Sequence, residues 1–221
     1  MPAVGNDIVD LEAPGNAGKS RESRFVDRVF TEEERLLIHG ASRPDRLLWL
    51  LWAAKEAAYK AVSRDDPAVG SIPRRYAVCL DGAEPGPGGS QTAGRVITPK
   101  GTMALAVFAT AQWVHALAGD IPPDGFCHEV AFVAGGEDPS AAARVNLLQA
   151  IGRQAGCPTE SFSILRDPDG PGAPGLFFRG SQLSVPFSLS HDGRFTAFAY
   201  DPAGLLAAIR AASGSSPSMK Y

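Results

Sequence analysis

The stretch from Trp49 to Val62, WLLWAAKEAAYKAV, constrains the fold most, because it contains neither Gly nor Pro and predicts a long helix. Steps of three and four residues place one stripe of side chains along this helix: Trp49, Trp52, Ala53, Glu56 and Lys60. Charged residues therefore continue an apolar face. For an arbitrary helix the ordinary explanation is a solvated Glu56–Lys60 pair, worth about 0.2 to 0.5 kcal/mol. The rest of the chain decides whether that explanation holds here.

Composition excludes several classes of protein. The 221 residues, 44% of them hydrophobic, can form one larger domain or two smaller ones with a packed core. A net charge of −3 provides no basic field for nucleic acid. The longest apolar run, residues 102–119, is interrupted by Gln112 and His115 and is rich in strand formers, so it predicts buried strands and not a membrane span.

Cysteine usage and the first residues bear on the compartment. The three cysteines have no metal-ligand spacing, and their odd number argues against a disulfide framework. The opening MPAVGNDIVDLE has neither a basic leader nor a long apolar core, so we expect no signal peptide. We therefore expect a cytoplasmic protein that binds neither nucleic acid nor membrane.

The first part of the chain predicts an α+β fold. Residues 4–11 suggest a short strand. Thr31 is placed to cap a following helix, with Glu34 at the capping-box position. The long helix ends near Arg64, and the segments YAVCLDG, GRVIT and TMALAVFAT predict successive strands.

The prolines and glycines of GDIPPDG, residues 119–125, make it the best linker in the chain. We place the first half at residues 1–118 and the second at 126–208. Residues 209–221 form a tail that ends in SGSSPSMKY and is too polar and small to fold.

The second half opens with a strand and continues with a helix whose ends are readable. Asp138 is the predicted N-cap, Pro139 the first helical position and Gly156 the C-terminal stop. Further strands follow. The order strand, helix, strands therefore occurs twice, which hints at internal duplication.

Three local signals bear on chemistry: Asp7 in GNDIVDL, Glu56 in WAAKEAAYKA and His191 in SLSHDG. Singly, each is weak, because an Asp at a strand end is usually a cap and a buried His is usually hydrogen-bonded core. Together they supply what phosphoryl transfer requires, namely hard oxygen ligands for Mg²⁺ and cations for phosphate charge. The residues alone indicate no more than this reaction class.

At these residues the sequence resembles the 4'-phosphopantetheinyl transferase superfamily. GNDIVDL is similar to the family's G-x-D motif, and Trp52 to Lys60 matches W-x-x-K-E-A-x-x-K in full. RFVDRVFTEEE resembles the region between those motifs in holo-acyl-carrier-protein synthases, and SLSHDGRFTAFAY resembles the S-x-S-H strand. The resemblance touches both halves.

The resemblance implies an α+β fold of two similar α/β halves that form a pseudodimer, with the active site between them. In the longer, surfactin-synthetase-activating type the S-x-S-H half comes first, whereas here it comes second, so the halves are expected in permuted order. We expect a monomer instead of the trimer formed by short synthases. The alternative is a short synthase with an appended domain.

The resemblance further implies an enzyme that transfers 4'-phosphopantetheine from coenzyme A to a serine of an acyl or peptidyl carrier protein, with Mg²⁺. Asp7 and Glu56 would bind the metal, and Lys60 would steady phosphate charge. The acceptor of the serine proton is Glu56 or a water beside it. Ser190 and His191 would reach the coenzyme's phosphates, and Lys55 would either contact phosphate or cover the helix edge.

Two departures from the family pattern matter. The long type has a second acid where this chain has Val9, and Asp10 is as suited to capping as to ligation. The G-K-P element falls where Ala173 replaces Lys, so we expect its phosphate contact to come from elsewhere, with three candidates: Arg144, Arg153 and Arg194.

Carrier proteins are acidic helical bundles, so an arginine face is a candidate dock, formed by Arg21, Arg24, Phe25 and Arg28. A solvated helix face is an equal alternative. Two other functions stay open: a non-catalytic member that binds carrier protein or coenzyme A, and an Mg²⁺-dependent nucleotide hydrolase on an unrelated fold. The sequence leaves the carrier open among fatty acid, polyketide and nonribosomal peptide synthesis.

Overall fold

A computed structural model describes residues 3–82, 88–166 and 174–214. The chain is mixed α and β, as expected. It begins with strand β1 (Val4–Asp10), followed by the short turn η1 (Lys19–Arg21) and helices α1 (Ser23–Val29), α2 (Glu32–Gly40) and α3 (Pro44–Asp65). The predicted capping box at the start of α2 is confirmed, with Thr31 and Glu34 bonding each other's backbone N–H.

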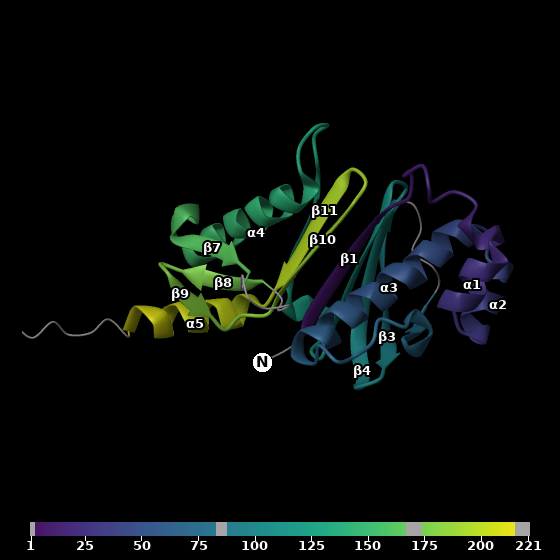
Figure 1. Cartoon of the computed structure of the whole chain (residues 1–221), viewed down its shortest axis with the longest axis horizontal. Helices are drawn as coiled ribbons and strands as arrows, with labels where there is room; N and C mark the ends of the chain where they lie inside the picture. Colours follow the sequence, from purple (N-terminus) through teal and green to yellow (C-terminus); the bar gives the residue numbers. More distant parts are fainter. Residues whose placement is uncertain (1–2, 83–87, 167–173, 215–221) are drawn as a thin grey trace, which may run out of the picture.

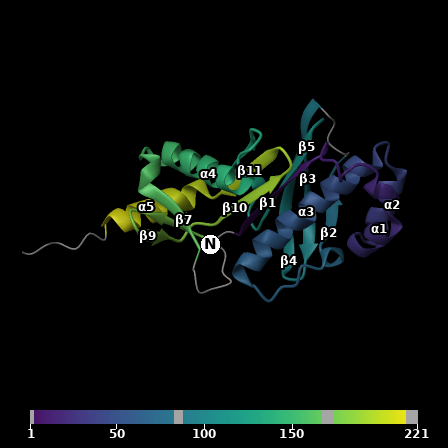
Figure 2. The same ribbon diagram turned by 45° about the horizontal axis from the view of Figure 1, so that its top comes forward.

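The first sheet has five antiparallel strands in the order β1-β5-β4-β3-β2. After turn η2 (Pro73–Arg75) its members are β2 (Ala77–Leu80), β3 (Gly88–Thr98), β4 (Gly101–Thr110) and β5 (Trp113–Gly119). The apolar run at 102–119 thus forms two buried strands, as predicted. Helix α3 lies along this sheet in both views (Figures 1 and 2), and its Leu48, Leu51 and Ala54 are fully buried in the core beneath it.

The rest of the chain forms two three-stranded sheets, β10-β11-β6 and β7-β8-β9. Turn η3 (Pro123–Gly125) leads to β6 (Cys127–Phe132), α4 (Pro139–Ala155) and turn η4 (Thr159–Ser161). The remaining elements are β7 (Phe162–Leu165), β8 (Gly175–Phe178), β9 (Ser181–Leu183), β10 (Phe187–Asp192), β11 (Phe195–Tyr200) and α5 (Pro202–Gly214). Helix α4 starts at the Asp138 cap and stops at a left-handed Gly156, which confirms both predicted ends.

The tail was predicted to begin at residue 209, and this start is wrong. Helix α5 continues to Gly214, because Leu205, Ala208, Ile209 and Ala212 pack on the second core. Residues 215–221 lie outside the described residues. The predicted boundary at 119–125 stays a prediction; in the structure Gly119 ends β5 and the rest of that segment connects β5 to β6.

The two parts of the chain meet where β1 and β10, each the edge strand of its sheet, lie side by side (Figure 1). Three alternate side chains of β10 bond to β1. The Asn6 N–H donates to Ser188 Oγ at 2.9 Å, Ser190 Oγ donates to the Asn6 side chain, and the Asp10 N–H donates to Asp192 Oδ2 at 2.8 Å. Unpaired strand edges expose backbone donors that need partners, and these side chains supply them. We call this contact the seam.

Candidate active site

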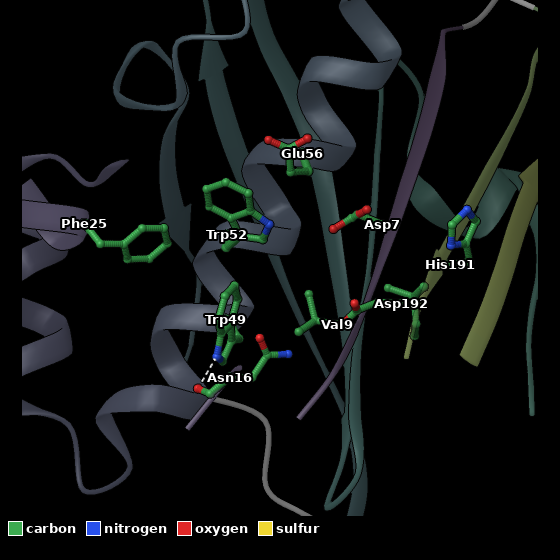
Figure 3. Close-up of a pocket in the computed structure, with 10 residues that line it drawn as sticks. Asp7, Val9, Asn16, Phe25, Trp49, Trp52, Glu56, His191 and Asp192 are labelled. Atoms are coloured by element: carbon green, nitrogen blue, oxygen red, sulfur yellow. Dashed lines mark hydrogen bonds between the residues drawn. The ribbon is translucent and has the colours of Figure 1, made fainter. Parts of the chain in front are cut away.

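A cavity of about 270 Å³ opens beside the seam. Strand β1, helices α1 and α3, the loop after β1 and the end of β10 all contribute to its wall (Figure 3). Its lining residues are Asp7, Ile8, Val9, Asn16, Phe25, Trp49, Trp52, Glu56, His191 and Asp192. The structure therefore brings Asp7, Glu56 and His191 together from three segments that are far apart in the sequence.

Gly5 explains why β1 and α3 lie so close. A Cβ at this position would lie 1.9 Å from the Ala57 carbonyl oxygen and 2.6 Å from the Ala61 backbone nitrogen. Only a residue without a side chain permits this approach. Since side chains alternate along a strand, Asp7 faces α3 as Gly5 does and is brought to Glu56.

The charges at the centre are unbalanced. Lys60 Nζ donates to Asp7 Oδ1 at 2.7 Å and to the Asn6 carbonyl at 3.2 Å. Burial raises the pKa of Asp7, although Lys60 opposes the shift. Burial and the nearby Asp7 charge raise the pKa of Glu56. The charge of Asp192, another cavity residue, also raises the pKa of Asp7. One ammonium thus faces three carboxylates, an arrangement that an added cation would stabilise.

Asp7 and Glu56 are the residues that could hold a metal ion. Their hard oxygen donors suit Mg²⁺, which usually takes only one or two carboxylates and completes its octahedron with water and phosphate oxygens. Within the described residues, no group of three or more His, Cys, Asp or Glu side chains could enclose a metal. The site therefore suits an ion shared with a phosphate substrate.

Aromatic side chains form the wall opposite β1. The Phe25 ring lies 6.1 Å from that of Trp49 and 5.8 Å from that of Trp52. Trp49 Nε1 donates to the Asn16 carbonyl at 2.8 Å, and Asn16 Nδ2 donates to the Asp10 carbonyl at 2.7 Å. The helical stripe pointed to the tryptophans, but Asn16 lies in a loop without a pattern, and sequence reasoning missed it.

The S-x-S-H segment divides between the cavity and the seam. His191 and Asp192 line the cavity, whereas Ser190 is only 4% exposed and donates to Asn6. The expectation that Ser190 reaches a coenzyme phosphate conflicts with this geometry, because the Ser190 side chain is buried and its hydroxyl is used in the seam. The sequence pattern pointed to His191 but not to its neighbour Asp192, which also lines the cavity.

Lys55 is also placed elsewhere than expected. It is 1% exposed and forms an ion pair with Glu34 at 2.7 Å. Its ammonium also donates to the carbonyls of Tyr76 and Pro73. All three N–H donors of Lys55 are therefore satisfied at its buried position. Lys55 neither contacts the cavity nor covers an exposed helix edge, so both earlier interpretations of it are wrong.

Asp10 has the capping role and not that of a ligand. It is 1% exposed, and Arg194 binds it through two nitrogens, at 2.8 and 2.7 Å. It also accepts the backbone N–H groups of Glu12 and Arg194. The hydrogen bonds from Arg194 hold the pKa of Asp10 below its ordinary value.

The arginines expected to replace the missing lysine differ in their surroundings. Arg194 is bound to Asp10 and to Glu12, and Arg153 pairs with Glu129 at 3.3 Å on the surface. Ala173 lies outside the described residues. Among the described residues, only His191 and Asp192 of the second half line the cavity, so none of Arg144, Arg153 and Arg194 does.

The residues of the expected dock do not form one surface. Arg24 and Arg28 are exposed on α1, and Arg21 is exposed in the preceding turn. Phe25 instead turns inward against the tryptophans of the cavity.

Comparison with known proteins identifies the region that carries this site. Residues 3–74 match the family model described as the 4'-phosphopantetheinyl transferase superfamily. This N-terminal region, with β1, the three helices and both carboxylates, thus carries the features of that superfamily.

Relatives of this region are holo-[acyl-carrier-protein] synthases. The protein of that name from Streptococcus agalactiae serotype III (strain NEM316) is 46% identical over 61 residues, which cover 26% of this chain and 50% of the relative. The one from Magnetococcus marinus (strain ATCC BAA-1437 / JCM 17883 / MC-1) is 39% identical over 62 residues, 27% of this chain and 45% of the relative. The chain thus spans about half the length of the curated relatives it matches. Among residues 3–82, 88–166 and 174–214, no helix combines the length and hydropathy needed to cross a membrane.

Proposed function

We propose that the protein is a 4'-phosphopantetheinyl transferase that modifies a serine of an acyl or peptidyl carrier protein, with coenzyme A as donor. The observation that carries the proposal is the convergence of Asp7 and Glu56 in one cavity with Lys60 beside them, inside the segment that matches the superfamily. Two carboxylates and an ammonium suit phosphoryl transfer, which depends on positioning and charge neutralisation.

In the reaction, the serine oxygen forms a bond to the phosphorus that carries the pantetheine arm. The pyrophosphate P–O bond breaks, and 3',5'-adenosine bisphosphate leaves. Glu56, or a water beside it, accepts the serine proton. Lys60 holds Asp7 in place and adds positive charge near the phosphates. Mg²⁺ held by Asp7 and Glu56 would act as a Lewis acid toward the pyrophosphate.

We also propose that the two parts of the chain form a pseudodimer with permuted halves. In its support, the first and last strands pair in both parts: β1 with β5, and β6 with β11. In both, the last strand then pairs with the one before it, β4 or β10. His191 would reach the coenzyme across the seam, and the chain would act as a cytoplasmic monomer. Arg21, Arg24 and Arg28 would dock the acidic carrier.

Mass spectrometry of an apo carrier protein incubated with this protein, coenzyme A and Mg²⁺ tests the proposal. Acyl and peptidyl carriers are assayed in parallel, since fatty acid, polyketide and nonribosomal peptide synthesis all use such domains. A transferase adds the phosphopantetheine arm to the carrier. Unmodified carrier with hydrolysed coenzyme would indicate a hydrolase, and unmodified carrier with bound coenzyme would indicate a non-catalytic member.

A further inference from the structure

The turn between β10 and β11 lies against the end of β1. It consists of Gly193 and Arg194, since Asp192 pairs with Phe195 across the hairpin. The Arg194 side chain grips both oxygens of Asp10, and the Arg194 N–H donates to the same carboxylate at 3.0 Å. In return, the Asp10 N–H donates to Asp192 Oδ2. The contact is thus reciprocal, and Asp192 is itself a cavity residue.

Glycine is required at the first position of this turn. Gly193 has a φ of +50°, and a Cβ there would lie 2.4 Å from Asp10 Oδ2. The close approach of the turn to Asp10 therefore depends on an absent side chain as well as on charge. Backbone conformation and ion pair fix the same position independently.

We infer that Asp10 and Arg194 are positioning residues whose ion pair holds the β10–β11 turn, and with it His191 and Asp192, against the cavity. Bidentate arginine–carboxylate pairs fix orientation as well as distance. The Asp10 carboxylate is buried, so water does not compete with Arg194 for its oxygens. The inference rests on the proposed function only for the ligand, coenzyme A.

Three variants disturb the turn, two by changing the ion pair and one by changing the backbone. Arg194→Ala removes the grip, and Arg194→Lys keeps the charge but not the bidentate geometry. Gly193→Ala keeps every charge and pushes the turn from Asp10. Matched controls are Arg153→Ala, which breaks an exposed ion pair on the same half, and Gly180→Ala, which adds a Cβ at a left-handed glycine with no atom within 4 Å.

The first measurement is amide hydrogen exchange in the free protein. Exchange at residues 10 and 194 should accelerate in Arg194→Ala, Arg194→Lys and Gly193→Ala, and not in the controls. The second is calorimetric titration with coenzyme A and Mg²⁺. We expect a dissociation constant raised about 10- to 100-fold for the turn variants and changed less than about twofold for Arg153→Ala.

Unchanged exchange in folded Arg194→Lys and Gly193→Ala would overturn the inference whatever the activity, and so would accelerated exchange with an unchanged coenzyme affinity. Wild-type protein that neither binds coenzyme A nor modifies a carrier would overturn the proposed function instead. In that case faster exchange in the turn variants still supports the part of the inference that concerns the turn.

Discussion

Asp7 and Glu56 define the chemistry at the scale of single residues. Both are partly withdrawn from water, and both have a raised pKa, although Lys60 lies within 2.7 Å of Asp7. A protein retains such carboxylates at a cost, because burial disfavours the charged form. A cation shared with a phosphate substrate would offset that cost.

We predict that Asp7→Ala and Glu56→Gln each lower carrier modification by roughly 100-fold or more, since each removes a proposed ligand of the Mg²⁺ that would neutralise phosphate charge. The melting temperature should not fall, because neither change removes core volume. Glu129→Gln, at an exposed carboxylate of β6, is the control. Near-wild-type transfer by both variants with Mg²⁺ would show that the proposed metal site is wrong.

Helix α3 performs two tasks on two of its faces. One face presents Glu56 to the cavity and places Lys60 on Asp7, and another buries Lys55 against Glu34 of α2. Glu34 also accepts the Val78 N–H of β2 at 2.9 Å, so this ion pair joins two helices and a sheet edge. The adjacent residues Lys55 and Glu56 thus serve structure and chemistry respectively.

At the scale of these elements, Lys55→Met should destabilise the fold by about 3 to 5 kcal/mol, because it leaves the Glu34 carboxylate buried without its cation. Adding Glu34→Gln should recover part of that loss. Urea unfolding measures both variants. Below the melting transition, Lys55→Met should keep the wild-type KM for coenzyme A. A large rise in this KM would show that Lys55 contacts the coenzyme's phosphates.

Helix α1 carries the proposed dock. Charge reversal at Arg24 or Arg28 should raise the KM for the carrier several-fold and leave the KM for coenzyme A unchanged, as exposed charges act mainly on encounter. Arg210→Glu, exposed on the distant α5, controls for net charge. An effect on coenzyme A in place of the carrier would move the dock elsewhere.

The whole molecule is built around the seam, and the cavity takes residues from both sides of it. Apolar clusters flank the seam beneath its hydrogen bonds, with Ile8 against Phe195 and Val4 near Leu117 and Phe126. A single chain therefore contains every residue assigned to the site.

Mixing inactive Glu56→Gln protein with inactive His191→Ala protein should restore no activity, because intact partners would have to come from different chains. Light scattering under assay conditions should give a monomeric mass. Activity that rises when the two variants are mixed would show that the site is formed between chains. It would leave the transferase assignment unchanged.

Acid should weaken the contact between the two parts. His115 of β5 is fully buried, its two ring nitrogens have no hydrogen-bond partner among the described residues, and it lies 5.5 Å from His128 of β6. Burial, then the charges of His128 and Lys60, lowers its pKa from 6.5 to about 3. Below pH 6.5 the unfolded chain therefore binds a proton at His115 that the folded protein does not bind. The free energy of unfolding is highest above pH 6.5 and declines as the pH falls.

The unfolding free energy should drop by about 1.4 kcal/mol per pH unit below 6.5 from His115 alone. Urea unfolding between pH 7 and 5 is compared between the wild type and His115→Leu, because the shifted pKa values of Asp7, Glu56 and His128 are common to both proteins. His115→Leu should flatten this slope, and an unchanged slope would contradict the assignment.

Local patterns in the sequence determined helices α2, α3 and α4 and most strands, but not α5. The Thr31 and Asp138 caps, the stop at Gly156 and the long helix through Glu56 follow from bonds within a few residues, so they are readable from the chain. The convergence of Asp7, Glu56 and His191 could be anticipated only through family resemblance. The fates of Lys55, Ser190, Asp10 and Arg194 were decided by tertiary structure. Each side chain has a partner more than 20 residues away, and no local pattern encodes which face of a helix or strand will meet that partner.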